Sequence, residues 1–343
     1  MQHFLELDPA DLNALLLQLV NRQYRVKQIN NWLFQQLEND ISKMSNLPKS
    51  LRQSLAAELD TVLPKIISQQ ISSDGTSKFL LQLVDASQIE MVLMPAAKKN
   101  TLCLSSQVGC ARACQFCATA TLGWQRNLQV SEILAQVYLA KQFLGEQKLT
   151  NLVFMGMGEP LDNLANVIRA IKILQHEQTF SFSPRRITVS TSGIIPGIKQ
   201  LAASGLKVKL AVSLNAALES KRDILMPVNR LYPLSELKKA LLDFRRETNF
   251  RITFEYVMIK NFNMDEEDIK AIKRFLGDIS CKINLIAWNA VEGLPYEAPD
   301  TAEIEKFSTA LQVLSAAVTQ RKSRGNDIAA ACGQLAAQAK KEK

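Results

Sequence analysis

The sequence of 343 residues contains no apolar run long enough to cross a bilayer, which takes about 20 mostly apolar residues. Its first residues, MQHFLELDPADLN, lack the basic segment followed by an apolar stretch that marks a secretory signal. No internal repeat stands out either. We therefore expect a cytoplasmic, monomeric protein without a membrane partner.

Cysteine is scarce, since the chain has six, and four of them fall between residues 103 and 117. This distribution does not suit a disulfide framework and, in a reducing compartment, indicates a metal site or catalysis. Acidic residues are fewer than basic ones, 33 against 41, and the net charge of +8 weakly favours a polyanionic partner. No Gly-x-Gly-x-x-Gly motif supports a Rossmann dinucleotide site.

Most of the chain reads as alternating strands and amphipathic helices. The expected strands are 101–106, 151–157, 186–191, 207–214, 251–259 and 282–288, with a short edge strand at 317–321. The expected helices are 131–144, 164–175, 197–204, 234–248, 266–277 and 302–314. Six βα units predict an α/β fold with a parallel sheet, either an incomplete (β/α) barrel or a doubly wound sheet.

Polar residues favour the barrel, because barrel enzymes place their active-site groups where strands end. Such residues follow five of the expected strands: the cysteine loop, 156–160, 190–193, 213–215 and Asn289. Their convergence on one face predicts a partial barrel with a single site.

Three regions are expected along the chain. Residues 1–63 form a helical accessory domain, whose basic residues Arg22, Arg25 and Lys27 are either a solvated helix face or an RNA contact. Residues 64–98 alternate with period two around an Asp-Gly turn and form a β connector. Glu90 is the only carboxylate in an apolar run there, and a lone Glu in a strand usually faces water. Residues 99–343 form the barrel.

The most distinctive stretch, 109–117, holds three cysteines at Cys-x3-Cys-x2-Cys spacing. Cys110, Cys114 and Cys117 can hold three corners of a [4Fe-4S] cube and leave the fourth iron open. A zinc knot is the alternative, with Cys103 as fourth ligand. The asymmetric spacing favours the cluster, and it resembles that of radical S-adenosylmethionine (SAM) enzymes, in which SAM binds the open iron.

Several polar residues could bind SAM, although each could also be an ordinary strand-end residue. Glu159 is suited to the ammonium group of SAM, because a charge-assisted hydrogen bond is strong in a partly dry site. Ser190, Ser213 and Asn289 are of the kind that binds a carboxylate or ribose. Cys332 lies among small residues that would let a bulky partner come close, although a buried inert cysteine is the ordinary expectation.

Over nearly its whole length the chain resembles the RlmN/Cfr family of radical SAM RNA methyltransferases. The resemblance rests on residues 24–29, 73–76, 105–110, 155–160, 225–229 and 332–335. Many radical SAM enzymes share the cysteine triplet, but few add a cysteine seven residues ahead of it and another near the C-terminus. The resemblance implies a partial (β/α)6 radical SAM barrel with an N-terminal helical accessory domain and a small β connector.

The resemblance also implies a reaction that uses both extra thiols. A first SAM methylates Cys332, whose thiolate is the nucleophile. A second SAM, bound to the cluster, yields a 5′-deoxyadenosyl radical that takes a hydrogen from the new methyl group, and the carbon radical adds to C2 of an adenine. Glu90 would then remove the ring proton, and Cys103 would attack the Cys332 sulfur, forming a disulfide and releasing the product.

The resemblance further implies ligands and partners. The residues it places around SAM are Gly158, Glu159, Ser190, Ser213, Leu214, Asn215 and Asn289. The substrates would be an adenosine at the peptidyl transferase centre of 23S rRNA and the adenosine 3′ of the anticodon in some tRNAs, both presented unstacked. The basic N-terminal helices would contact RNA, and a reductant such as flavodoxin or ferredoxin would supply electrons.

The sequence departs from the family pattern at Asn215, where His is usual, and at Ala287, where Pro is usual. A divergent paralogue that methylates another adenosine, or C8 as Cfr does, therefore stays open. Two other classes also remain. A radical SAM enzyme with a protein or small-molecule substrate would not need Cys332, and a zinc-stabilised RNA-binding module would have no catalysis.

Overall fold

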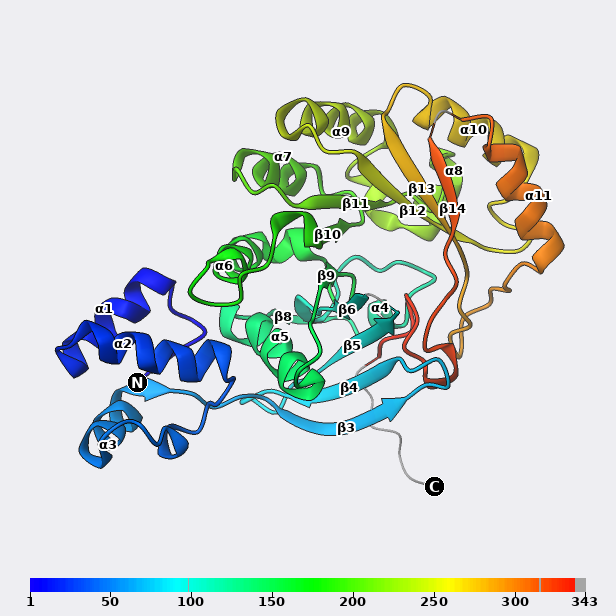
Figure 1. Ribbon diagram of the computed structural model, residues 1–343. Coiled ribbons are helices and arrows are strands. Elements are labelled where there is room, and N and C mark those ends of the chain that lie inside the picture. The colour runs from blue at the N-terminus through cyan, green and yellow to red at the C-terminus, as the bar shows by residue number, and fades with distance from the viewer. Residues whose placement is uncertain (98, 315, 337–343) are drawn as a thin grey trace.

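The computed structural model describes residues 1–97, 99–314 and 316–336. Three short helices at the N-terminal end lie to one side of a large curved sheet, which carries its helices on the outside (Figure 1). The end of the predicted barrel region, 337–343, lies outside the described residues. No helix within the described ranges is both long and apolar enough to cross a membrane.

The first 60 residues form a small helical unit. Its elements are β1 (Gln2–His3), α1 (Pro9–Val20), α2 (Gln23–Asn30), a π-helical turn (Asn31–Gln35), a 3-10 turn (Ile41–Lys43), α3 (Lys49–Glu58) and β2 (Leu59–Asp60). Asp8 stands at the N-cap position of α1, without a capping hydrogen bond from its side chain. The ring of Phe4 packs 5.9 Å from Phe34 and 5.6 Å from Tyr138, so the unit is fastened to the barrel helix α5.

A ten-stranded sheet forms the centre of the molecule, in the order β14-β13-β12-β11-β10-β9-β6-β5-β4-β3. Its strands are β3 (Lys65–Ile71), β4 (Ser77–Gln82), β5 (Gln88–Ala96), β6 (Lys99–Cys103), β9 (Asn151–Phe154), β10 (Ile187–Thr191), β11 (Lys209–Ser213), β12 (Ile252–Met258), β13 (Cys281–Ala287) and β14 (Ala317–Gln320). The pairs from β6 to β14 are parallel, and the pairs from β3 to β6 are antiparallel.

The predicted parallel strands and the predicted hairpin are therefore all present. The structure adds that they belong to one sheet, because β5 pairs with β6 along residues 92–96. The β connector thus extends the wall of the barrel, and Cys103 on β6 lies opposite Val92 on β5.

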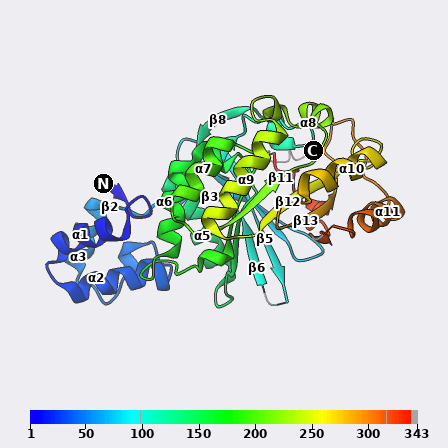
Figure 2. The same cartoon turned by 90° about the horizontal axis from the view of Figure 1, so that it is seen from above.

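Helices cover the outer face of the parallel strands (Figures 1 and 2). They are α5 (Val130–Leu144), α6 (Leu164–Gln175), α7 (Ile195–Ala203), α9 (Leu234–Thr248), α10 (Glu266–Leu276) and α11 (Thr301–Leu311). The shorter α4 (Ala118–Thr121) lies in the cysteine loop, and α8 (Glu219–Leu225) contacts that loop and the ends of β10 and β11. Strand β12 shows how the two faces differ. Phe254 packs on Phe275 of α10 and Tyr256 on Phe307 of α11, whereas Glu255 and its alternate neighbour Val257 line an internal cavity. Because successive side chains of a strand point to opposite faces, one set packs against the helices and the other lines the site.

Candidate functional site

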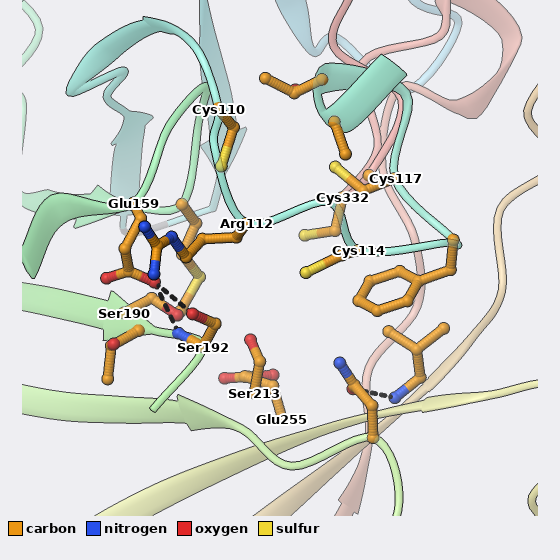
Figure 3. Close-up of a pocket in the computed structure, with 18 of the residues that line it drawn as sticks. Cys110, Arg112, Cys114, Cys117, Glu159, Ser190, Ser192, Ser213, Glu255 and Cys332 are labelled. Atoms are coloured by element: carbon orange, nitrogen blue, oxygen red, sulfur yellow. Dashed lines mark hydrogen bonds between the residues drawn. The ribbon is translucent and has the colours of Figure 1, made fainter. Parts of the chain in front are cut away.

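One internal cavity gathers most of the residues that the sequence singled out (Figure 3). Those that line it are Cys110, Cys114, Cys117, Gly158, Glu159, Ser190, Ser213, Asn215 and Cys332. They come from the cysteine loop, from the ends of β9, β10 and β11, and from the C-terminal segment. The predicted convergence of strand ends on one site is thus what the fold produces.

The cysteine loop is held at its base by a small two-stranded sheet, β7 (Gln107–Gly109) with β8 (Trp124–Asn127). The backbone N–H of Cys110 donates to the carbonyl of Gly123 over 2.9 Å. Gly109 has a φ of +74°, and a Cβ there would lie 1.8 Å from that same carbonyl oxygen. Only glycine permits this close approach, which turns the cysteines into the cavity.

Glu159 is almost fully buried and is fixed in position by three donors. The backbone N–H and the hydroxyl of Ser192 donate to Oε2 over 2.7 and 2.8 Å, and the N–H of Leu161 donates to Oε1 over 3.0 Å. Burial raises the pKa of Glu159, and these hydrogen bonds oppose the rise. A carboxylate is therefore presented to the cavity in one orientation.

The other predicted SAM residues behave differently from one another. Asn215 has a φ of +55°. Its side-chain oxygen accepts from Val257 N–H over 2.9 Å, and its side-chain nitrogen contacts the Met226 sulfur, so its polar atoms are engaged inside the fold.

Leu214 is buried, and its backbone carbonyl accepts from Arg222, so it contributes no surface to the cavity. Asn289 donates over 3.1 Å to the carbonyl of Cys332.

Arg222 is a site residue that reading the sequence did not find. Its buried guanidinium donates to the carbonyls of Ser192 over 2.7 Å and of Ser213 over 2.9 Å, as well as to that of Leu214. It thereby ties the ends of β10 and β11 together. Burial lowers the pKa of Arg222 to about 10, which leaves it charged at neutral pH. A lone arginine on an amphipathic helix gives no signal of this role.

Cys332 also lines a second, smaller cavity, which it shares with Cys103. Arg321 lines both cavities, and it lies near enough to oppose the rise in the pKa of Cys103, which burial takes to about 12. The six cysteines are all free. Cys103 and Cys332, to which the resemblance assigns catalytic roles, therefore line the same cavity, and no disulfide joins them.

Residues 325–336, which we call the thiol segment, carry Cys332 and are fastened to the cysteine loop on one side. Ala118 N–H donates to the carbonyl of Gly333 over 2.7 Å, and the hydroxyl of Thr119 donates to that of Leu335 over 2.7 Å. Both donors belong to α4, directly after Cys117. The thiol segment and the triplet are thus held against each other by backbone contacts.

The β connector fastens the other side of the thiol segment. The carboxylate of Asp327 accepts from the hydroxyl of Ser72 over 2.6 Å and from Ser73 N–H over 3.1 Å. Asp74 accepts from Gly325 N–H over 3.1 Å. These contacts join the β3–β4 turn to a segment some 250 positions later in the chain.

Glu90 lies under the thiol segment and not on a wet face, because it is only 2% exposed. The ammonium of Lys78 lies 3.1 Å from Oε1 and also donates to the carbonyl of Ala329 over 3.3 Å. Ala336 N–H donates to Oε2 over 2.9 Å. The alternative that Glu90 is a solvated strand residue is therefore wrong, since the ion pair and the segment cover it.

Two family models match the chain. One is described as the radical SAM superfamily and matches residues 104–275, and the other as the ribosomal RNA large subunit methyltransferase N-terminal domain and matches residues 2–60. Among solved structures, a radical SAM methyltransferase from Sphaerobacter thermophilus is 41% identical with a TM-score of 0.95, and the match covers 98% of this chain and 100% of that one.

Two more distant structures are also similar. A domain of a pyruvate-formate lyase-activating enzyme from Bacteroides vulgatus ATCC 8482 is 16% identical with a TM-score of 0.39, over 50% of this chain and 99% of that one. HydG, a maturase of the [FeFe]-hydrogenase, is 13% identical with a TM-score of 0.47, over 66% and 52%. These scores are too low to support a functional comparison.

The barrel and its cysteine-lined cavity thus define a radical SAM enzyme, and this chain belongs to that superfamily. Within it, the chain belongs to the RlmN-like methyltransferases, as the N-terminal match and the 41% identity over the whole fold show. Enzymes of this family use a [4Fe-4S] cluster and SAM.

The residues present fit both groups. The Cys110, Cys114 and Cys117 thiols are partly buried and line one cavity, and burial raises the pKa of each. Three thiols on one loop that open into the same cavity suit three corners of a [4Fe-4S] cube.

Proposed function

We propose that this protein methylates C2 of adenosine in 23S rRNA, at the peptidyl transferase centre, and in tRNA, at the adenosine 3′ of the anticodon. Its carrier would be a methyl group on Cys332, and each turnover would use two SAM. The observation that carries the proposal is the position of Cys332, which lines the cavity of the cysteine triplet and also the cavity of Cys103. A single thiol with access to both is what a methyl carrier requires.

When bound, the cluster and SAM supply the methyl group and the hydrogen-abstracting radical. This chain's residues do the rest. Sγ of Cys332 is the nucleophile that takes up the methyl group, and Glu159, fixed by Ser192 and Leu161, receives the ammonium group of SAM. Cys110, Cys114 and Cys117 would hold the cluster, and Gly158, Ser190, Ser213 and Asn215, which line the cavity, would surround SAM. Leu214 lies behind them as a backbone partner of Arg222. Asn289 orients the carrier, because it holds the Cys332 carbonyl.

Glu90 and Cys103 complete the proposed cycle. Glu90 would take the proton from the ring carbon once the new bond has formed. Because its carboxylate now receives Ala336 N–H, the end of the thiol segment must shift before Glu90 can act. Once the adduct has lost that proton to Glu90 and one electron to the bound cluster, the Cys103 thiolate would attack Sγ of Cys332 and break the bond between that sulfur and the transferred carbon. The carbon would take up a proton to become the methyl group, and the external reductant would return the resulting disulfide to two thiols. The cavity that the two cysteines share supports this attack.

An RNA substrate is supported by the N-terminal family match and by the net charge of +8. The N-terminal helices lie at the far end of the molecule from β14, with α5 and α6 between them and the sheet (Figure 1). Residues such as Arg22 would therefore bind parts of the RNA distant from the target adenosine, as a large folded RNA permits.

Nucleoside mass spectrometry of rRNA and tRNA, from cells with and without the protein, tests the substrate. We expect 2-methyladenosine to disappear with the protein. Loss of 8-methyladenosine would instead show Cfr-type chemistry, and an unchanged nucleoside profile would contradict an RNA substrate.

The Cys103→Ala variant tests the carrier. We expect a covalent adduct between RNA and Cys332 to accumulate, because the thiol that releases the product is absent. A folded, cluster-loaded variant that forms no adduct would contradict the carrier scheme.

A further inference from the structure

A row of polar side chains crosses the inner wall of the barrel. In register, Ser213 on β11 lies opposite Glu255 on β12, which lies opposite Asn284 on β13, which lies opposite Thr319 on β14. Thr319 donates to Asn284 Oδ1 over 2.6 Å, and Asn284 Nδ2 donates to Glu255 Oε1 over 2.8 Å. Each hydrogen bond fixes the next side chain, so the carboxylate of Glu255 is held in one orientation.

The last oxygen of that row has no protein partner. Glu255 is 6% exposed, and its Oε2 accepts no hydrogen bond from the described residues. The carboxylate lines the main cavity and lies beside Ser213 in the close-up (Figure 3). Burial raises the pKa of Glu255, and the nearby Arg321 opposes the rise.

A buried carboxylate oxygen without a donor is costly, because it has lost its water without a replacement. Glu255 lines the cavity of the cysteine triplet, in which SAM would bind. A ligand group that donates a hydrogen bond to Oε2 would therefore remove the free-energy cost of burying that oxygen. Carboxylates accept only, and the group must therefore be a hydroxyl or an amine.

The walls of the cavity favour a hydroxyl. Further toward the strand ends, Val257, Ile286 and Trp288 line the same cavity and form an apolar surface that suits a flat base. The polar row lies beside this surface, where the sugar of a nucleoside would sit when its base lies against the apolar wall.

We propose that Glu255 is a binding residue whose Oε2 accepts a hydrogen bond from a ribose hydroxyl of the nucleoside in the cavity. The nucleoside is either the adenosyl group of SAM or the target nucleotide. The proposal rests on the proposed function through the use of SAM or, if the nucleoside is the target nucleotide, through the RNA substrate, whereas an error in the carrier role of Cys332 would leave it standing.

Calorimetry on the cluster-reconstituted full chain tests the proposal. The probes are S-adenosylhomocysteine and its 2′-deoxy and 3′-deoxy analogues. We expect one hydroxyl deletion to weaken binding to the wild type by about tenfold to a hundredfold, the range for a hydrogen bond to a charged group. Glu255→Met should weaken the parent ligand similarly and should be indifferent to the same deletion, because its side chain offers the hydroxyl no strong hydrogen-bond acceptor.

The second arm distinguishes the source of the ribose. Adenosine monophosphate and its two deoxy forms are titrated into protein saturated with S-adenosylhomocysteine. If the deletion effect and its loss in Glu255→Met appear only here, the ribose belongs to the target nucleotide. If they appear only with S-adenosylhomocysteine, it belongs to SAM.

Glu305→Met, at an exposed carboxylate on α11, is the matched control and should bind as the wild type does. The proposal is overturned if neither hydroxyl deletion weakens the wild type for either probe, a result that needs no variant at all. It is also overturned if Glu255→Met, with an unchanged melting temperature, stays as sensitive to the deletion as the wild type.

Discussion

The two halves of the barrel hold their functional residues by different means. In the parallel half, Ser190, Ser213 and Glu255 are placed by the strands that carry them and by register with their neighbours. The thiol segment, which packs against the antiparallel half, has no regular strand or α-helix of its own and is held by side-chain and backbone contacts to the connector and to the cysteine loop.

This difference follows from what each half is proposed to do. A cofactor is bound in one orientation, and sheet geometry supplies that orientation without further contacts. A methyl carrier must meet one group and then another, so it needs a segment that individual contacts can hold and release. The predictions below test this comparison.

The largest effect is expected from the cysteines. Cys114→Ala should abolish RNA methylation together with bound iron, because the cluster loses a thiolate. Cys332→Ala should abolish methylation while the iron content and the visible absorption spectrum stay as in the wild type. Methylated RNA produced by Cys332→Ala would show that the antiparallel half carries no methyl group.

Arg222→Met should destabilise the parallel half most. The change leaves the carbonyls of Ser192, Ser213 and Leu214 buried without a donor, and we expect the free energy of unfolding to fall by about 3 kcal/mol. Denaturant unfolding of the full chain measures this. Arg185→Met, at an exposed position, should change it by less than about 0.5 kcal/mol. Equal effects would mean that Arg222 does not tie the strand ends.

Asp327→Ala should release the thiol segment without unfolding the barrel. Its carboxylate joins the segment to Ser72 and Ser73, so we expect faster alkylation of Cys332 by iodoacetamide, followed by peptide mass spectrometry, at an unchanged melting temperature. Alkylation of Cys114 serves as the internal reference and should keep its rate. The variant Glu305→Ala, which changes an exposed carboxylate elsewhere, should behave as the wild type; a parallel rise at both cysteines would indicate general loosening.

The smallest expected effect is that the contacts holding the thiol segment weaken at acidic pH. Burial alone would raise the pKa of Asp74, but hydrogen bonds from Thr76 and Gly325 bring it from 3.8 to about 2. The hydroxyl and backbone N–H donors of Ser72 and Ser73 likewise lower the pKa of Asp327. A lowered pKa means that the contact stabilises the folded chain above pH 3.8 and that this contribution is lost as the pH falls from there toward 2.

Hydrogen exchange of the thiol segment, corrected for the intrinsic effect of pH, measures this acid dependence. Protection should stay level from neutral pH to about pH 4 and fall below it, since that is where an unperturbed Asp begins to take up a proton. In the Asp74→Asn variant, this loss of protection at acidic pH should be smaller. Protection that already declines between pH 7 and 5 would point to another group.

Much of the parallel half could be predicted from the sequence. The expected helices 164–175 and 234–248 coincide with α6 and α9, the expected strands contain β9 to β12, and the expected strand 282–288 overlaps β13 except for its first residue. Apolar periodicity and polar residues at strand ends can be recognised from a few neighbouring residues. A parallel sheet then brings the carboxyl ends of its strands to the same edge, regardless of the conformation of the loops. This is why Glu159, Ser190 and Ser213 could be placed together before the fold was known.

Local signals could not show the contacts of Glu90, Arg222 and Glu255. Glu90 in an apolar strand could equally face water, and only Lys78 and the thiol segment decide that it is buried. Glu255 also lies in an apolar strand, and its importance depends on which face the barrel encloses. A period of two tells which residues share a face but not what covers that face.

By itself, the sequence determined the order of strands and helices, the triplet of thiols and the polar residues at the strand ends, because spacing and periodicity act over a few residues. Only the tertiary structure decided that Cys103 and Cys332 line one cavity and that Glu90 lies under the end of the thiol segment, because both contacts join residues more than 200 positions apart. Such contacts depend on how a curved sheet closes and on what packs against its edge, and no local pattern encodes either.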